Sequence, residues 1–168
     1  LLKIIIGYFG STILLNHYKG GDALAFFRIA QPISPILFKD PIGFLGFITG
    51  LGNDAAFFRQ HGPVRLWYIY DLFYNDNRTM IRIHSFIGIF SFGKYQVHVA
   101  IFNMLSFIGL FGIFKAVRKI THRNPYLILA IIFMIPGVLF WISQPSKESI
   151  LIFGLGLFIY FYFLLLFS

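Results

Sequence analysis

Long apolar stretches alternate with short polar turns through the second half of this sequence. The stretches at 95–114, 126–144 and 150–167 contain no Asp, Glu, Lys or Arg. A helix of about 20 residues crosses the hydrocarbon core of a bilayer, because each residue adds about 1.5 Å. We predict a membrane-spanning helix over each stretch, with Pro136 kinking the second one. A fourth, shorter apolar run at 1–15 predicts another such helix.

The region between the first two predicted spans, residues 16–94, has a different pattern. It contains most of the acidic residues, yet three of its segments are apolar and aromatic: Pro41–Leu51, Val64–Tyr74 and Ile81–Phe92. Each is too short to cross a membrane, and Trp and Tyr side chains favour the depth of the lipid headgroups. We predict interfacial or re-entrant helices here, with a further span over 81–92 and its flanks as the alternative.

The amino-acid composition indicates the class of protein. The chain has 168 residues, of which 58% are hydrophobic and 12% are charged, and a soluble domain of this size cannot bury so much apolar surface. We therefore predict an all-α, polytopic membrane protein with about four transmembrane helices in a single membrane domain over 1–168. Both ends lie within apolar runs, so we expect a chain truncated at each end.

The distribution of basic residues predicts the orientation in the membrane. The link at 115–125 carries Lys115, Arg118, Lys119 and Arg123 and no acidic residue, which is typical of a cytoplasmic loop. Residues 16–94 and 142–149 are then extracytoplasmic. Lys3, at the start of the first apolar run, agrees with a cytoplasmic beginning.

The net charge of +8 bears on the partners. The basic residues are dispersed among membrane segments, so we expect membrane lipids or a phosphate-bearing lipid as partners, and no nucleic acid. The sequence has no P-loop, no GxSxG motif, no HExxH motif and no histidines at i,i+4 spacing. No metal site is predicted, and a divalent cofactor stays an open possibility.

Several polar residues are candidates for chemistry. Asp22 follows two glycines directly after the first apolar run, where a carboxylate can act as a general base, hold a metal ion, or cap a helix. Asp71, Asp76 and Arg78 flank an aromatic stretch; they can bind a headgroup or sugar, or form the solvated edge of an interfacial helix.

Polar residues within or beside the predicted spans have two interpretations. For His98 and Asn103 we predict interhelical hydrogen bonds. The charged pair Lys147-Glu148 lies on the short turn before the last apolar run. Charge at that depth is costly, so the pair is either functional or a helix-cap pair on a solvated turn.

Three motifs together resemble one family. A Gly-Gly-Asp-Ala turn follows the first apolar run, NRTMIRIHSF at 77–86 leads through FGKY to SFIGL at 106–110, and IPGVLFWIS at 135–143 precedes SKES at 146–149. This combination resembles the multi-pass proteins of bacterial, Bacteroidetes-type surface-polysaccharide loci. These are similar to integral-membrane glycosyltransferases of the GT-C fold, which use polyprenyl-phosphate sugars. The turn departs from their pattern at Gln144, where a glycine is expected.

The resemblance implies roles for particular residues. Asp22 matches the acidic residue of the first extracytoplasmic loop, which activates the acceptor hydroxyl. Lys147 matches the cation that binds the lipid phosphate, with Glu148 supporting it and Trp141 in the same substrate-binding segment. The implied partners are a polyprenyl-phosphate lipid and a glycan acceptor. The alternatives are a polysaccharide polymerase or flippase-like protein, and a non-catalytic subunit that binds other membrane subunits.

Overall fold

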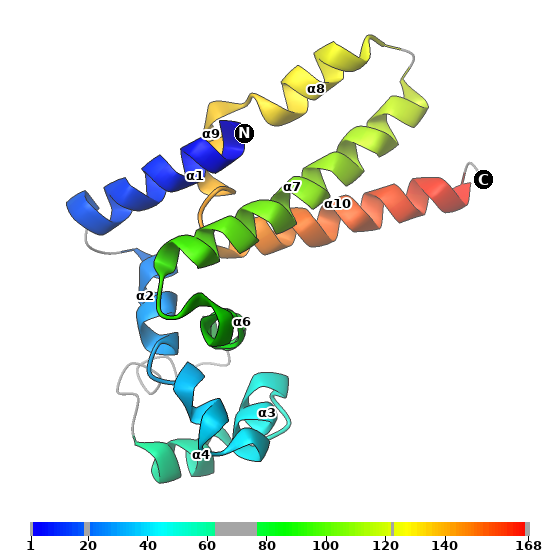
Figure 1. Cartoon of the computed structure of the whole chain (residues 1–168). Helices are drawn as coiled ribbons and strands as arrows, with labels where there is room; N and C mark the ends of the chain where they lie inside the picture. Colours follow the sequence, from blue (N-terminus) through cyan, green and yellow to red (C-terminus); the bar gives the residue numbers. More distant parts are fainter. Residues whose placement is uncertain (1, 19–20, 63–76, 122, 167–168) are drawn as a thin grey trace. The chain divides into compact units, whose positions relative to one another are not determined.

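The computed structural model describes residues 2–18, 21–62, 77–121 and 123–166, and every regular element in these ranges is a helix (Figure 1). The all-α prediction is therefore confirmed for this part of the chain. The chain divides into two compact units, which are described separately: unit 1 is Leu1–His17 with Val99–Ser168, and unit 2 is Tyr18–His98. The prediction of one membrane domain over 1–168 stays a prediction.

Unit 1 contains the longest helices. Helix α1 (Leu2–Ile13) continues directly into the π-helical turn η1 (Leu14–Tyr18). Helix α7 (Tyr95–Ile120) belongs to unit 1 from Val99 onward. The remaining elements are α8 (Pro125–Phe133), α9 (Pro136–Trp141) and α10 (Lys147–Leu166).

Among the described helices, α7 and α10 are the two that are long and apolar enough to cross a membrane. Most of α10 is exposed, including Leu151 at 65%, Phe158 at 67% and Leu165 at 81%. A 20-residue apolar helix with exposed sides is unlike the core helix of a soluble protein, and it supports a membrane protein. The predicted spans at 1–15 and 126–144 correspond to shorter helices, so a four-span topology is not confirmed.

Pro136 interrupts the segment predicted as the third span. Helix α8 ends at Phe133, and α9 begins at Pro136 itself. Proline has no N–H to donate and its ring clashes with the preceding turn, so it is tolerated at the first position of a helix and breaks one elsewhere. The predicted kink is confirmed, and it takes the form of a complete break.

Glycines allow a close backbone contact between α7 and α10. A Cβ atom on Gly156 would collide with the carbonyl oxygen of Gly109, and one on Gly112 would lie 2.6 Å from the carbonyl oxygen of Gly156. The two helices run in the same direction, because α8 and α9 return the chain between them (Figure 1). Small residues allow this close backbone approach, as in helix pairs that associate within membranes.

Lys3 is buried within unit 1, which its position near the start of an apolar run did not indicate. The residue is 8% exposed, and its ammonium group donates to Asn103 Oδ1 at 2.8 Å, Ser106 Oγ at 2.6 Å and the Ile142 carbonyl oxygen at 3.1 Å. It therefore contacts the turn predicted to be extracytoplasmic, so the predictions of a cytoplasmic Lys3 and of an extracytoplasmic 142–149 turn disagree with each other. Periodicity and charge counts give no sign that a lysine has oxygen partners distant in sequence.

Unit 2 is built from short helices. These are α2 (Asp22–Ala30), the 3₁₀ helix η2 (Ser34–Phe38), α3 (Pro41–Thr49), α4 (Asp54–His61), α6 (Asn77–Ser91) and the first turn of α7. Helix α6 packs against α2, η2 and α3, while α3 also packs against η2 and α4. The predicted helices at 41–51 and 81–92 correspond to α3 and α6, and the one at 64–74 lies outside the described residues.

Aromatic side chains fill the core of unit 2 beneath α3 and α4. Phe47 stacks on Phe57 with ring centroids 5.2 Å apart and meets Phe58 edge-on at 5.6 Å. Asp40 caps α3 by accepting a hydrogen bond from the Gly43 N–H at 2.8 Å. The aromatic side chains of α3 and α4 thus pack on one another.

Candidate functional site

Two histidines and a serine form a buried polar cluster in unit 2. His84 on α6 and His98 in the first turn of α7 stack with ring planes 14° apart, and their Nδ1 atoms lie 2.9 Å from each other. His98 Nε2 lies 3.0 Å from the Ser91 hydroxyl. All three residues are at most 1% exposed, so this is a continuous hydrogen-bonded chain within the protein.

The contact between the two Nδ1 atoms limits where the ring protons of His84 and His98 can be. One Nδ1 must carry a hydrogen and the other must accept it, because a hydrogen bond needs one donor and one acceptor. In one arrangement His98 Nδ1 donates to His84 and His98 Nε2 accepts from Ser91. In the other, His98 Nε2 donates to Ser91, whose hydroxyl then donates to the Gly88 carbonyl oxygen at 3.5 Å. Both arrangements contain the same contacts of 2.9 Å and 3.0 Å, and the second adds the longer contact to Gly88.

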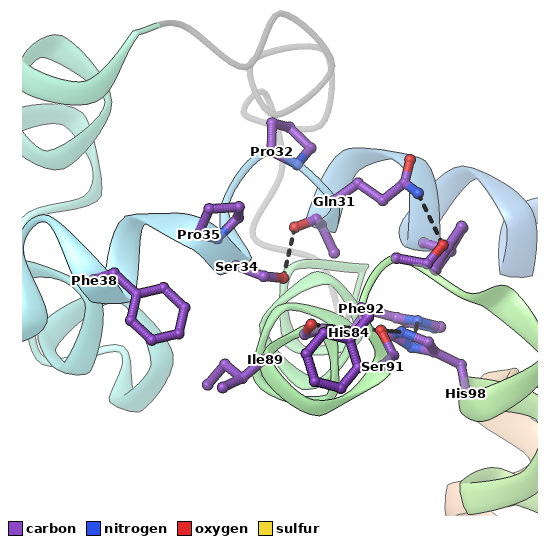
Figure 2. A pocket seen from close by; sticks show the side chains of 14 residues that line it. Gln31, Pro32, Ser34, Pro35, Phe38, His84, Ile89, Ser91, Phe92 and His98 are labelled. Atoms are coloured by element: carbon purple, nitrogen blue, oxygen red, sulfur yellow. Dashed lines mark hydrogen bonds between the residues drawn. The ribbon is translucent and has the colours of Figure 1, made fainter.

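A cavity of about 600 Å³ lies beside this cluster. Figure 2 shows His84, Ser91 and His98 on one side and η2 with Pro35 and Phe38 on the other. Most of the residues that line it are apolar, and the polar ones are the two histidines, Ser91, Ser34 and Gln31. A pocket of this size with a few grouped polar atoms is typical of small-molecule sites.

The backbone turns sharply where the cluster meets the end of α6. Phe92 has φ of 50° and Gly93 has φ of 73°, so two successive residues adopt left-handed conformations directly after Ser91. Such a conformation costs a residue with a Cβ about 1–3 kcal/mol. Gln31 Nε2 donates to the Gly93 carbonyl oxygen at 3.3 Å, which links this turn to the end of α2.

A second polar region surrounds the turn 142–149 in unit 1. The Ser149 hydroxyl donates to the Gln144 carbonyl oxygen at 2.6 Å and to the Ile142 carbonyl oxygen at 3.0 Å. Asn103 Nδ2 donates to the Ser143 carbonyl oxygen at 3.1 Å, and Lys3 donates to Ile142. These bonds fix the turn to α1 and α7. The interhelical hydrogen bonds predicted for Asn103 and His98 are confirmed: Asn103 accepts from Lys3 on α1, and His98 pairs with His84 on α6.

This turn positions three of the predicted site residues. Lys147 and Glu148 are the first two residues of α10, with Lys147 partly exposed and Glu148 exposed. Trp141 ends α9 and is 63% exposed. The side chains of Ser143 and Gln144 lie buried beneath the turn. Gln144 occupies the place of the expected glycine, and its amide packs against Gly10.

Asp22, the predicted catalytic residue, lies in unit 2. It is the first residue of α2 and is exposed, while Gly21 with φ of 108° is the N-cap. The alternative that Asp22 itself caps the helix was wrong, because the glycine takes the non-helical position that precedes it. Asp22 belongs to unit 2 and Lys147 to unit 1.

The remaining predicted residues have separate surroundings. Asp71 and Asp76 lie outside the described residues. Arg78 is partly buried at the start of α6. Burial raises the pKa of Asp54, and the charges of Arg82 and Arg78 oppose that rise. Arg82 also donates to Asp54 at 2.8 Å.

Sequence reasoning missed the His84–His98–Ser91 cluster. The two histidines are 14 residues apart on different helices, so no helical spacing or ligand motif joins them. The sequence FGKY at 92–95 lies between the two histidines. Its Phe-Gly pair is the local sign that α6 and α7 fold back on each other here.

Comparisons with protein families, with curated proteins and with solved structures find no match to this chain.

Proposed function

We propose that the protein is an integral-membrane, glycosyltransferase-like protein that transfers a sugar from a polyprenyl-phosphate donor during surface-polysaccharide assembly. The observation that carries this proposal is the position of Lys147. It is the first residue of a span-length apolar helix and partly exposed, on a turn held by the Ser149 hydrogen bonds. That is a suitable place for a cation that binds the phosphate of a membrane lipid.

The chemistry of the turn supports this role for Lys147. A phosphate leaving group gains negative charge in the transition state, and a fixed cation stabilises that charge. The N-terminus of a helix adds favourable backbone N–H groups and a partial positive charge. Glu148 is the adjacent exposed residue and orients or balances the lysine, while the exposed Trp141 ring offers a face for a sugar or a headgroup.

Asp22 supplies the proposed base. Its carboxylate is exposed at the start of α2, where it is accessible to a hydroxyl of the glycan acceptor. Proton transfer from that hydroxyl to a carboxylate contributes typically about 10²–10⁴-fold to a rate. In the proposed topology about four helices span the bacterial inner membrane, with Asp22 and Lys147 both extracytoplasmic, and Arg78, Asp71 and Asp76 contribute to sugar or headgroup binding.

Sugar transfer in proteoliposomes tests the proposal. The chain is reconstituted with a polyprenyl-phosphate sugar carrying a radioactive label, and label in a glycan acceptor is counted. Asp22→Asn should reduce transfer by about 10²-fold or more, since it removes the base and keeps the shape. Lys147→Gln should reduce it similarly, and Arg118→Gln, an exposed substitution near the end of α7, is the matched control.

Two other outcomes assign the alternatives. Loss of lipid-linked glycan handling in Lys147→Gln but not in Asp22→Asn would indicate a polymerase or flippase-like protein. No transfer by the wild-type chain, with no effect of either substitution on lipid binding, would indicate a non-catalytic subunit.

A further inference from the structure

We propose that Ser91, His98 and His84 form a nucleophilic site that accepts an acyl group from an ester with an apolar chain bound in the neighbouring cavity. This activity is independent of the sugar transfer proposed above, because it uses none of the same residues. The inference rests on the order of the three side chains, on the cavity and on the turn that follows Ser91.

The order of contacts is that of an activated serine. A serine nucleophile needs a hydroxyl on one imidazole nitrogen and an orienting group on the other. Here Ser91 Oγ lies 3.0 Å from His98 Nε2, and His84 Nδ1 lies 2.9 Å from His98 Nδ1. When His84 accepts from His98, the lone pair of His98 Nε2 faces the serine hydroxyl, as a general base requires.

The cavity determines the class of acyl donor. Ser91 and His98 line it together with Gly88, while Pro32, Pro35, Phe38 and Ile89 supply apolar walls. These walls suit a hydrocarbon or aromatic acyl chain. Ser91 and His98 are buried, so the acyl carbon must approach from the cavity side, and little water competes at His98 Nε2.

Backbone strain next to the serine is the third observation. Phe92 and Gly93 both have positive φ, so α6 ends at once after Ser91. A β-carbon-bearing residue in this conformation indicates a constraint from its surroundings, and such strain concentrates at functional sites. Ser91 is the last helical residue before this turn and lines the cavity.

The proposed step balances without an added cofactor. The Ser91 Oγ–H proton passes to His98 Nε2 while Oγ bonds to the acyl carbon. The ester C–O bond then breaks, and the departing alcohol takes the proton from His98. A water molecule or a second alcohol releases the acyl group by the same sequence in reverse.

An alkyl fluorophosphonate tests this site directly in the full chain in detergent micelles. In the expected reaction, Ser91 Oγ bonds to phosphorus, fluoride leaves and His98 takes the proton. We expect close to one label per chain, located on Ser91 by peptide mass spectrometry, and none in Ser91→Ala. Ser85→Ala, a buried serine on α6 that donates to the Ile81 carbonyl oxygen, is the matched control and should label normally.

The rate of labelling in a His98 variant distinguishes a serine nucleophile from a serine that only links two helices by a hydrogen bond. His98→Gln should label at least about 100-fold more slowly than wild type, since the general base is removed. The wild-type chain supplies a test without any variant: labelling should disappear when the protein is unfolded in dodecyl sulfate. Absence of label on Ser91 in the folded chain, or equal labelling of folded and unfolded chain, would overturn the proposal.

Discussion

The Lys3 ammonium donates to the side-chain oxygen of Asn103 at 2.8 Å, across 100 positions of the sequence. The same ammonium reaches Ser106 and the Ile142 carbonyl oxygen, so a single buried cation joins α1, α7 and the turn before α10. Its partners in these contacts are neutral oxygens, which provide hydrogen bonds in place of a countercharge. Asn103 is bound in turn to the Ser143 carbonyl oxygen, which extends the network along the turn.

Replacing Lys3 with Met should loosen unit 1. The substitution gives an uncharged side chain one atom shorter, removes the hydrogen bonds of the ammonium and leaves Asn103 Oδ1 without its ammonium donor. We expect a loss of about 1–3 kcal/mol in the free energy of unfolding, since hydrogen bonds inside membranes contribute about 1 kcal/mol each. Denaturation in mixed micelles, followed by circular dichroism, measures it.

Arg118→Met is the control for removing a positive charge from unit 1, because Arg118 is an exposed residue of α7. Equal stability losses for Lys3→Met and Arg118→Met would contradict a specific role for the buried ammonium.

A pair of nearby glycines on α10 should respond in opposite ways to added side chains. Gly156→Val should separate α10 from α7 and cost about 1–3 kcal/mol, because the new side chain collides with the Gly109 carbonyl. Gly154 has nothing within 4 Å of the place of its Cβ, so Gly154→Ala should be neutral or stabilise the helix by up to about 1 kcal/mol. Thermal unfolding of the two variants side by side decides the matter, and similar midpoints would be inconsistent with the close helix contact.

These contacts show where sequence reasoning reaches and where it stops. Helix starts and breaks at Pro41, Pro125 and Pro136 follow from local chemistry, because proline fixes φ and lacks an N–H. The apolar runs likewise locate α7 and α10. By contrast, Lys3 depends on partners 100 or more residues away, and His98 on a histidine of another helix. Neither charge counts nor periodicity contain that information.

Acid should weaken unit 2 through Asp40. The hydrogen bond from His61, at 2.9 Å, and the Gly43 N–H together hold the pKa of Asp40 below its ordinary value. A carboxyl with a depressed pKa stabilises the fold above its unfolded pKa, near 3.8, and that contribution disappears as the pH falls through the folded value. Denaturant unfolding between pH 5 and about 2 should show this loss, with a shallower decline in Asp40→Asn. A parallel decline in both proteins would exclude Asp40 as its source.

The ionisation of Asp54 should depend on the neighbouring arginines. Burial raises its pKa, while the charges of Arg82 and Arg78 oppose that rise. Arg82→Met therefore raises the pKa of Asp54 further, since one of the opposing cations is removed. Carboxyl ¹³C chemical shifts followed through a pH titration measure the change. Arg59→Met, an exposed substitution on α4, should leave the titration where it is in the wild type.

The distance along the chain between Lys3 and its carbonyl partner sets a requirement on synthesis. Ile142 is made 139 residues after Lys3, which at about 5–20 residues per second is a delay of roughly seven to thirty seconds. The ammonium has none of its final acceptors until Asn103 is made, 100 residues after Lys3, and its acceptor in the turn comes last. The nascent first helix must therefore keep Lys3 in contact with water or lipid headgroups, and it can settle into its final position only after most of the chain has left the ribosome.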